Sequence, residues 1–515
     1  MIRFILNEKE IATDLPPGMV LLDFIRYHQH LVGTKIGCRE GDCGACTILV
    51  GRIDNGEMQY ESMTSCLVPL GNVQGRHIVT IEGINFTDSL NPIQQAMADA
   101  GATQCGFCTP GFVVSMSGFC LRRDTTSCVS MQDALAAIDG NICRCTGYKS
   151  IERAAGIVTE LMKERNDEEA ITFVTRKKIL PEYFDGINKR LQSILKMELP
   201  APGSRLKTQL VGGGTDLYVQ KHDEMTNASI RFVFDEPALN GISLEDNKCI
   251  IGASVTVSDL MCSSIINNAF PDFQRYARLI SSTPIRNMAT IAGNFINASP
   301  IGDLTIFFLA LDVQITLSTY GEENLNPDPR LNVSVGQAST QGGDGNHTDS
   351  GREVALRNFY KGYKQLEIKP GERIEKIWFE IPGKNSPKET KDFFGESLRT
   401  YFNFEKVSKR THLDIASVNS AISITRNGAE LAKAGLSAGG VGPVPMYLQK
   451  TSAFLKGKMV NEETVNGAIE VMKTEISPIS DARGTKEYKK LLLGQLIKAH
   501  FIKLFPEMAT EKLLK

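Results

Sequence analysis

The chain has 515 residues, of which 42% are hydrophobic and 23% charged, and its formal net charge is -2. A chain of this length is expected to form about three or four domains, and its composition predicts folded cores rather than extensive disorder. The near-neutral charge gives no support to nucleic-acid binding, so we expect no nucleic-acid partner.

The sequence contains no apolar run near the length of about 20 residues that a membrane-spanning helix needs. The N-terminal stretch MIRFILNEKE reaches a glutamate at once and lacks the apolar centre of a secretory signal. We therefore expect a soluble cytoplasmic protein with no membrane partner.

The first 82 residues combine short strand patterns with one helical pattern. Residues 20–31 place apolar side chains at helical spacing, and a loop rich in glycine and cysteine follows them. Strands are expected at residues 2–6, 10–13, 47–53 and 78–81. This order predicts a small sheet wrapped on one helix.

Helical signals dominate the next stretch, residues 83–165. Pro92 follows Asn91, and Pro110 follows Thr109, and each pair is typical of a capping residue with proline at the first helical position. Two further helices are expected near Ser130 and Ser150. The pattern therefore predicts a compact bundle of four helices.

The remainder of the chain mixes both kinds of element. Residues 164–169 (ERNDEE) predict a charged link, and residues 170–383 alternate apolar runs with helical patterns, as in an α/β or α+β domain. Residues 321–351 contain few apolar side chains and are expected to form a mobile surface loop. Strands followed by helices predict a last α+β domain over residues 384–515, so the whole chain is expected to be an α+β multidomain protein.

Cysteine usage carries the clearest chemical signal, because ten of the 12 cysteines lie before residue 146. Clustered cysteines in a cytosolic chain favour metal or redox chemistry over disulfides. The segment GCREGDCGAC has C-x4-C-x2-C spacing, with a fourth cysteine after 19 intervening residues, as in plant-type 2Fe–2S proteins. The four cysteines are Cys38, Cys43, Cys46 and Cys66.

A two-iron cluster needs a tight loop that aims backbone N–H groups at its sulfurs. Gly37, Gly41 and Gly44 allow the close approach and unusual backbone angles that such a loop requires. A structural zinc site is the alternative, but zinc prefers pairs of short knuckles to a triple with one remote ligand.

A second group of cysteines comprises the pairs Cys105 and Cys108, in QCGFCTPGF, and Cys143 and Cys145, in CRCTGY. The pairs are 34 residues apart, and each is expected near a helix start, where the helix favours the negative charge of a thiolate-bound cluster. On spacing alone a zinc site stays open. Two cysteines match no ligand position and are expected to be packed thiols: Cys120 and Cys128.

A possible nucleotide site lies in QLVGGGTDLYV (209–219), where an apolar strand, three glycines and an expected helix follow one another. Backbone N–H groups of such a loop could meet a pyrophosphate. The segment is neither a P-loop nor G-x-G-x-x-G, so the three glycines alone are weak evidence.

Taken together, these motifs resemble the xanthine dehydrogenase type of molybdenum hydroxylase. The resemblance rests on the two cysteine groups, on QLVGGGTDLYV, on IRNMATIAGNFINASPIGDL (285–304) and on FEKVSKRTHLDIASV (404–418), and it continues through AGGVGPVPM and SDARGTKEYKKLLLG. The resemblance implies a β-grasp ferredoxin-like domain, a four-helix 2Fe–2S domain, an FAD-binding domain of the molybdenum-hydroxylase type and a C-terminal flavoprotein domain. These domains are expected at residues 1–82, 83–165, 170–383 and 384–515.

The resemblance also implies the residues of the sites. The cluster ligands would be Cys38, Cys43, Cys46, Cys66, Cys105, Cys108, Cys143 and Cys145. The FAD contacts would be Leu210, Val211, Gly212, Gly213, Gly214, Thr215, Asp216, Leu217, Thr290, Ile291, Gly293, Asn294 and Asp303, with Lys406 near the isoalloxazine. Gln104 would approach the molybdopterin, and no residue of this chain is expected to act as a catalytic acid or base.

The function that the resemblance implies is electron transfer in an oxidoreductase. Electrons would pass from a molybdenum-cofactor partner subunit through two 2Fe–2S clusters to FAD and then NAD during purine hydroxylation. The partner would be the large subunit, in a hetero-oligomer with two copies of each chain. The alternatives are the same role in an aldehyde or other N-heterocycle hydroxylase, a stand-alone iron–sulfur flavoprotein carrier or redox sensor, and a zinc-containing structural adaptor.

Overall fold

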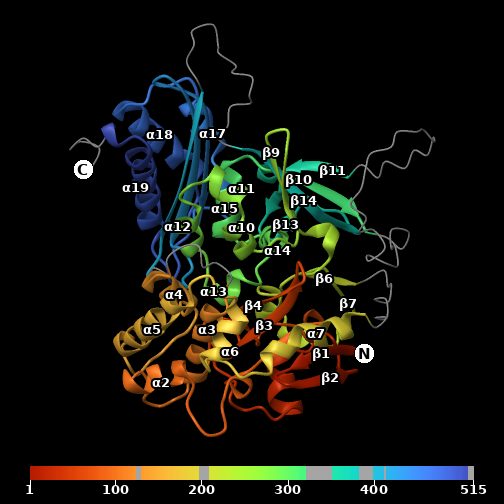
Figure 1. Cartoon of the computed structure of the whole chain (residues 1–515). Coiled ribbons are helices and arrows are strands. Elements are labelled where there is room, and N and C mark those ends of the chain that lie inside the picture. Colours follow the sequence, from red (N-terminus) through yellow and green to blue (C-terminus); the bar gives the residue numbers. More distant parts are fainter. Residues whose placement is uncertain (123–128, 197–207, 321–350, 382–397, 411–412, 509–515) are drawn as a thin grey trace. The chain divides into compact units, whose positions relative to one another are not determined.

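The computed structural model describes residues 1–122, 129–196, 208–320, 351–381, 398–410 and 413–508 (Figure 1). The chain divides into two compact units. Unit 1 comprises residues 1–234, 256–259 and 280–289, and unit 2 comprises residues 235–255, 260–279 and 290–515. Residues 321–350 of the expected surface loop lie outside the described residues.

Unit 1 opens with a five-stranded sheet in the order β2-β1-β5-β3-β4. Its strands are β1 (Ile2–Leu6), β2 (Lys9–Thr13), β3 (Thr47–Asp54), β4 (Glu57–Thr64) and β5 (His77–Val79). β1 pairs parallel with β5, and the other neighbours are antiparallel. The short helix α1 (Leu21–Asp23) and a π-helical turn (Phe24–His28) pack buried Leu21, Phe24 and Ile25 against this sheet. The predicted sheet on one helix is confirmed.

The predicted bundle of four helices is also confirmed. Its helices are α2 (Pro92–Asp99), α3 (Thr109–Cys120), α4 (Met131–Ala137) and α5 (Lys149–Met162). Asn91 and Gln94 cap the start of α2 reciprocally, and the Ser130 side chain accepts a hydrogen bond from the Asp133 amide at the start of α4. These caps satisfy amides that the first helical turn leaves without partners. Helix α3 is buried along most of its length and contacts β3.

Helices α6 (Ala170–Arg176) and α7 (Phe184–Leu195) share the core of unit 1. The ring of Phe184 lies 5.6 Å from that of Tyr60 and 5.5 Å from that of His77, both on the sheet. The Tyr183 hydroxyl donates to the carbonyl of Gly83 at 2.9 Å. This buried aromatic cluster joins α7 to strands β4 and β5.

The last elements of unit 1 surround the triple glycine. Strands β6 (Gln209–Val211) and β7 (Ile230–Phe232) pair in parallel, and α8 (Leu217–Gln220) and α9 (His222–Thr226) lie between them in the sequence. A later turn of helix, α13 (Thr283–Arg286), also belongs to this unit. Helix α10 (Val257–Cys262) crosses from one unit into the other.

Among its described residues, unit 2 contains two larger antiparallel sheets and a two-stranded hairpin. The first has the order β11-β10-β14-β9-β8, and the second has the order β15-β16-β17-β18. The strands of the first are β8 (Ile242–Glu245), β9 (Lys248–Gly252), β10 (Gln314–Thr319), β11 (Arg352–Ala355) and β14 (Glu372–Glu380). Those of the second are β15 (Arg399–Val407), β16 (Val418–Asn427), β17 (Glu430–Gly439) and β18 (Met446–Tyr447), and a small hairpin adds β12 (Tyr360–Gly362) and β13 (Gln365–Leu366).

The helices of unit 2 pack beside these sheets. They are α11 (Ser264–Ala269), α12 (Phe273–Arg278), α14 (Ile291–Asn297), α15 (Asp303–Ala310), α16 (Leu356–Phe359), α17 (Gln449–Leu455), α18 (Glu462–Glu475) and α19 (Lys486–Leu504). The C-terminal helices α17, α18 and α19 share one apolar core with strands β16 and β17. Helix α15 is buried along most of its length and contacts the same strands.

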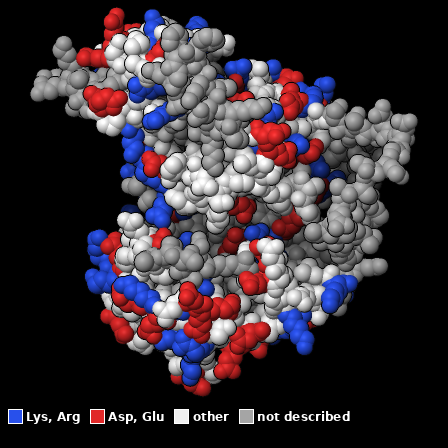
Figure 2. Space-filling view, turned by 45° about the horizontal axis from the view of Figure 1, so that its top comes forward, with Lys and Arg blue, Asp and Glu red and all other residues white. Residues whose placement is uncertain are grey.

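The face in Figure 2 carries basic and acidic side chains interspersed, in keeping with the small net charge of -2. Among the described helices, none has both the length and the apolar character needed to cross a membrane.

His500 should make the stability of unit 2 depend on pH. This side chain is buried, its Nδ1 accepts a hydrogen bond from Asn403 at 2.9 Å, and burial lowers its pKa to about 3. Between that value and the ordinary pKa of about 6.5, only the unfolded state binds the proton, so stability falls as pH falls.

We expect His500→Met to reduce the pH dependence of unfolding free energy by about 1 kcal/mol per pH unit between roughly pH 6 and 4.5. Urea titrations followed by the fluorescence of Trp378, the only tryptophan, measure the effect. His30→Asn is the control, because His30 is exposed with a φ of 57° that asparagine tolerates. Equal slopes in His500→Met and the unmodified protein would contradict the prediction.

Candidate functional site: two cysteine quartets and the flavin segments

The first four cysteines converge at one end of the sheet. Cys38, Cys43 and Cys46 lie in the loop before β3, and Cys66 follows the end of β4. The thiols of Cys38 and Cys43 hydrogen-bond to each other, and so do those of Cys46 and Cys66. Two pairs of thiols suit a two-iron cluster, in which each iron takes two cysteine ligands.

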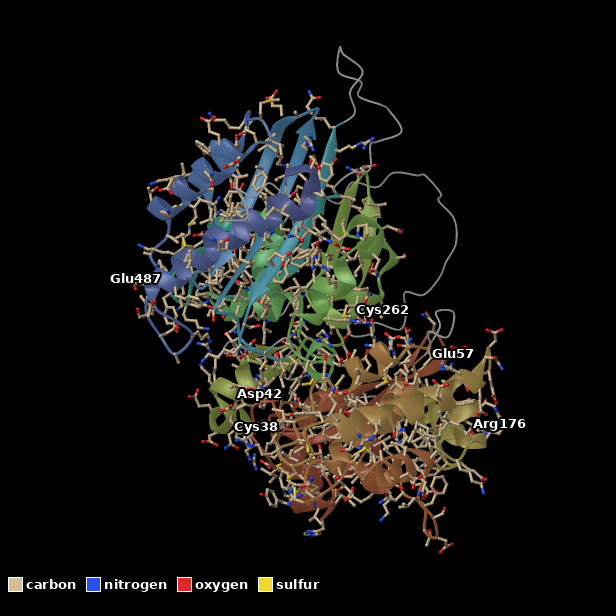
Figure 3. All side chains as sticks on the ribbon, turned by 90° about the vertical axis from the view of Figure 1, so that its left-hand side faces the viewer. Cys38, Asp42, Glu57, Arg176, Cys262 and Glu487 are labelled. Atoms are coloured by element: carbon tan, nitrogen blue, oxygen red, sulfur yellow. The ribbon has the colours of Figure 1, made fainter. Side chains whose placement is uncertain are left out.

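Backbone amides of this loop point at the sulfurs. The Glu40 amide lies 3.3 Å from the Cys38 sulfur, and the Cys38 amide lies 3.4 Å from the Cys43 sulfur. Asp42, beside Cys38 in Figure 3, also donates its amide to Cys38. The hydrogen bond from Cys43, together with these amides, lowers the pKa of Cys38 to about 5, so the loop favours a thiolate.

Glycines make this loop possible. Gly41 and Gly44 have φ values of 78° and 66°, a region that other residues rarely adopt. A Cβ at Gly37 would lie 2.6 Å from the Cys43 sulfur. The loop therefore needs glycine where the backbone passes close to the sulfurs.

The second quartet also forms two pairs. The sulfurs of Cys105 and Cys145 are 3.6 Å apart, and the thiols of Cys108 and Cys143 hydrogen-bond to each other. Cys108 is the capping position of α3, and the Thr146 amide donates to the Cys143 sulfur at 3.4 Å. The structure thus brings together the four cysteines that the sequence suggested, again as two pairs.

The two quartets differ in exposure. Cys46 and Cys66 are buried, whereas Cys105 and Cys145 are exposed. Phe107 and Tyr148, near the second quartet in the sequence, are 47% and 40% exposed. Gln104 is exposed as well. The second quartet therefore has an exposed pair at the surface of unit 1, and the first has a buried pair inside it.

Backbone contacts join the quartets directly. The Ile142 amide donates to the Cys43 carbonyl at 3.0 Å, and Ile142 is bonded to Cys143 along the chain. The Asn141 side chain donates to the Gly44 carbonyl at 3.1 Å and accepts from Ser115. Sequence reasoning missed Asn141 and Ile142, for which adjacency to Cys143 was the only available signal.

Across the residues that the structure describes, no three or more His, Cys, Asp or Glu side chains are grouped to hold one metal ion. Cys120 is fully buried, and burial raises its pKa to about 12, as expected of a packed thiol. Cys128 lies outside the described residues.

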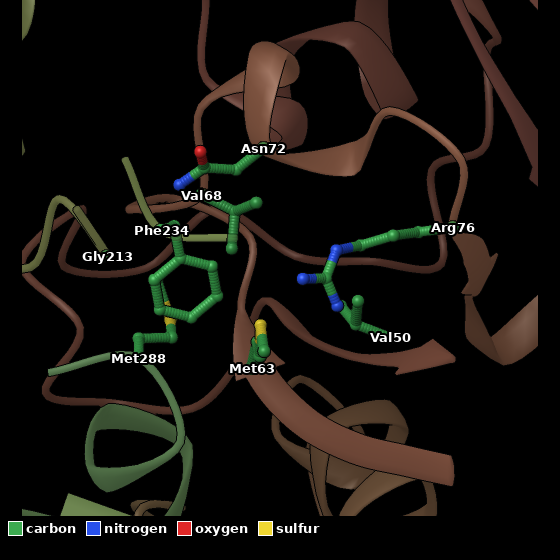
Figure 4. Close-up of a pocket in the computed structure, with 8 residues that line it drawn as sticks. All are labelled: Val50, Met63, Val68, Asn72, Arg76, Gly213, Phe234 and Met288. Atoms are coloured by element: carbon green, nitrogen blue, oxygen red, sulfur yellow. The ribbon is translucent and has the colours of Figure 1, made fainter. Parts of the chain in front are cut away.

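The glycine-rich segment forms a strand, a turn and a helix of only four residues in unit 1. The Gly212 carbonyl accepts a hydrogen bond from Asn72 at 2.9 Å. A Cβ at Gly213 would lie 1.7 Å from the Met288 carbonyl oxygen, and Gly214 has a φ of 81°. Figure 4 shows Asn72, Gly213 and Met288 around a small cavity that Arg76 also lines. All the candidates from Leu210 to Leu217 lie in this segment.

The other flavin candidates lie in unit 2. The Thr290 side chain accepts from the Gly293 amide at 3.1 Å and so caps α14, which Ile291 begins. The Asn294 side-chain oxygen accepts from the amide and the hydroxyl of Thr305, at 3.1 and 2.7 Å. Asp303 is the first residue of α15. The candidates therefore fall into two groups, one in each unit.

Asp303 and Lys406 meet in a buried ion pair. The Lys406 ammonium donates to Asp303 Oδ2 and to the Leu279 carbonyl, both at 2.7 Å, and only 1% of its side chain is exposed. Asn419 donates to Asp303 Oδ1 at 2.5 Å. Burial raises the pKa of Asp303, against the opposing effect of Lys406. The sequence did not indicate Asn419 or the Leu279 carbonyl.

At this site, Lys406 can donate and Asn419 can accept one further hydrogen bond from a ligand. An ammonium carries three hydrogens, and in the described part of the chain Lys406 uses two. Among the described residues, the buried Asn419 Oδ1 has no hydrogen-bond partner. Buried polar atoms normally have one, so these residues fit a flavin, as the paired thiols fit two iron–sulfur clusters.

Four domain families match the chain in sequence order. They are the 2Fe-2S iron-sulfur cluster binding domain at residues 4–70, the [2Fe-2S] binding domain at 80–156, the FAD binding domain in molybdopterin dehydrogenase at 194–327 and the CO dehydrogenase flavoprotein C-terminal domain at 403–504. The first two ranges contain the two cysteine quartets, and the last two contain the flavin candidates.

Curated relatives match most of the chain. Xanthine dehydrogenase of Emericella nidulans is 28% identical over 91% of this chain and 36% of its own length. Xanthine dehydrogenase 1 of Arabidopsis thaliana is 25% identical over 93% of this chain and 38% of its own length. The chain thus spans little more than a third of these relatives.

A solved structure of reconstituted CO dehydrogenase from Oligotropha carboxidovorans is similar at 21% identity, with a TM-score of 0.46 over 58% of this chain and 90% of that one. The two 2Fe-2S domain matches, the FAD-binding match and the similarity to xanthine dehydrogenases support an iron–sulfur and FAD protein of the molybdenum hydroxylase type.

Proposed function

We propose that this chain carries electrons in a xanthine dehydrogenase, from a molybdenum-cofactor partner to NAD during hydroxylation of hypoxanthine and xanthine. The observation that carries the proposal is the contact, through Ile142 and Cys43, between a quartet with an exposed cysteine pair and a quartet with a buried pair. The names of the curated relatives support the choice of substrate. When bound, the clusters and FAD supply the electron-transfer chemistry.

The residues of the chain hold and separate these groups. The eight cysteines provide ligands, and the amides of the first loop stabilise negative charge on sulfur. The exposed pair, Cys105 and Cys145, would face the molybdenum partner, with Gln104, Phe107 and Tyr148 beside it. We propose a hetero-oligomer with two copies of each chain, located in the cytoplasm, where thiols stay reduced.

In this proposal the turn from Leu210 to Leu217 and the residues Thr290, Ile291, Gly293 and Asn294 contact FAD. Lys406 would give its remaining hydrogen to the flavin, and Asp303 would fix the direction of the ammonium.

The first experiment is purification of the complex from its native cells through this chain. A co-purifying molybdenum protein and xanthine-dependent NAD reduction would support the proposal. A complete complex that oxidises an aldehyde or another heterocycle instead would move the substrate and keep the electron-transfer role. A chain with both clusters and FAD but no molybdenum partner would indicate a stand-alone carrier.

Cys145→Ser should disconnect the chain from its electron donor. We expect loss of the second cluster's paramagnetic signal and a fall of about 100-fold in substrate-dependent NAD reduction. NADH oxidation by an artificial dye should persist, because it needs only FAD. The control is Cys120→Ser, in a buried thiol outside both quartets, and loss of both activities in Cys145→Ser would count against the proposed electron path.

Lys406→Met should weaken FAD binding by about tenfold or more, because hydrogen bonds from charged donors are among the stronger ones. Equilibrium dialysis of the deflavinated protein with FAD measures the change. Lys489→Met is the matched control, since Lys489 is also buried in unit 2 and pairs with Asp481 at 2.7 Å. An equal loss of FAD in both variants would mean that Lys406 acts only through the fold.

A further inference from the structure

We propose that Arg286 is a positioning residue for electron transfer between the two clusters. In this proposal it fixes residues 139–143, which end at the ligand Cys143, against the loop of the first cluster. The inference rests on the proposed electron-transfer function and assigns a role to a residue outside both quartets.

Arg286 forms a buried ion pair across a long stretch of sequence. Its Nη2 donates to Asp139 Oδ2 at 2.6 Å, and the two side chains are 2% and 6% exposed. Its Nη1 donates to the carbonyls of Ile280 and Ser281, at 2.9 and 3.1 Å. The guanidinium therefore ties residues 280–286 to the end of the helical bundle.

Thr283 binds the other oxygen of the Asp139 carboxylate. Its amide donates to Asp139 Oδ1 at 2.7 Å, and its hydroxyl donates to the Ala136 carbonyl at 2.6 Å. Arg286 also donates to the Thr283 hydroxyl at 2.6 Å. Both carboxylate oxygens of Asp139 are thus held, so the residue has one well-defined position.

From Asp139 the chain runs directly into the contact between the quartets. A Cβ at Gly140 would lie 2.8 Å from Pro284, and a Cβ at Gly44 would lie 2.4 Å from the Gly140 carbonyl. Asn141 and Ile142 then make the hydrogen bonds to Gly44 and Cys43. The segment is held by Arg286 at its start and by the first cluster's loop at its end.

Helix α13, with Asn287 just after it, also contacts the domain of the first cluster. A Cβ at Gly41 would lie 2.7 Å from Ile285, and the Asn287 side chain donates to the Ser62 carbonyl at 2.8 Å. Residues 283–287 therefore contact both cluster domains within unit 1. They belong to the range matched by the FAD binding domain, 194–327.

A buried ion pair is a poor source of stability, because desolvation of the two charges offsets their attraction. Well-packed apolar side chains of similar volume usually stabilise a protein as much as a buried ion pair does. The ion pair instead fixes the orientation of the two side chains, because the planar guanidinium makes several hydrogen bonds in a fixed geometry. The rate of electron transfer falls steeply with distance. This geometry would therefore keep the distance between the clusters fixed.

The test uses the full chain with its clusters and FAD. We expect Arg286→Met to slow electron transfer between the clusters by about tenfold and to weaken the magnetic interaction between the reduced clusters in electron paramagnetic resonance. Arg286→Lys should restore part of both. Arg176→Met is the control, because its ion pair with Glu168 is partly exposed, with 51% and 26% of the two side chains accessible.

If Arg286→Met does not fold, the double variant Asp139→Leu/Arg286→Met, which removes both charges, takes its place. Full cluster and FAD content with unchanged interaction and rate in this double variant would overturn the role of Arg286. A purified unmodified chain without two clusters and FAD would instead overturn the proposed function. A slower rate with intact individual cluster signals would support the proposal.

Discussion

The hydrogen bond from the Ile142 amide to the Cys43 carbonyl is the contact on which the arrangement of the two quartets depends. It brings together two backbones that carry the proposed cluster ligands, and this approach leaves no room for side chains. A Cβ at Gly111 would lie 2.3 Å from the Gly44 carbonyl, and one at Gly44 would meet Gly140 at a similar distance. Glycine is therefore needed on both sides of the contact.

Burial gives the two quartets different surroundings. Cys46 and Cys66 belong to the apolar core of the sheet, whereas Cys105 and Cys145 are exposed. Solvent exposure and hydrogen bonds to sulfur set the reduction potential of such clusters. Two clusters of one type bound at these quartets would therefore differ in potential.

Local signals in the sequence predicted much of the fold. Strand 47–53 and the helix starts at Pro92 and Ser130 were predictable, because alternation and capping act over a few residues. The position of α13 in unit 1 and the pairing of Asp139 with Arg286 were not. These contacts join residues far apart in the sequence and leave no periodic pattern. Their spacing allowed the cysteines to be proposed as ligands. No such pattern marked Asn141 or Ile142 as the residues that join the two quartets.

Two buried lysines of unit 2 illustrate how a candidate site differs from an ordinary ion pair. Lys406 pairs with Asp303 and Lys489 pairs with Asp481, each at 2.7 Å. Burial raises the pKa of Asp303, whereas the hydrogen bond from Lys489 lowers the pKa of Asp481. Protein contacts therefore stabilise the charge of Asp481 but compensate that of Asp303 incompletely. Carboxylates with such uncompensated burial concentrate at functional sites, and this difference, which the sequence could not reveal, favours Asp303 and Lys406 as the pair that meets a ligand.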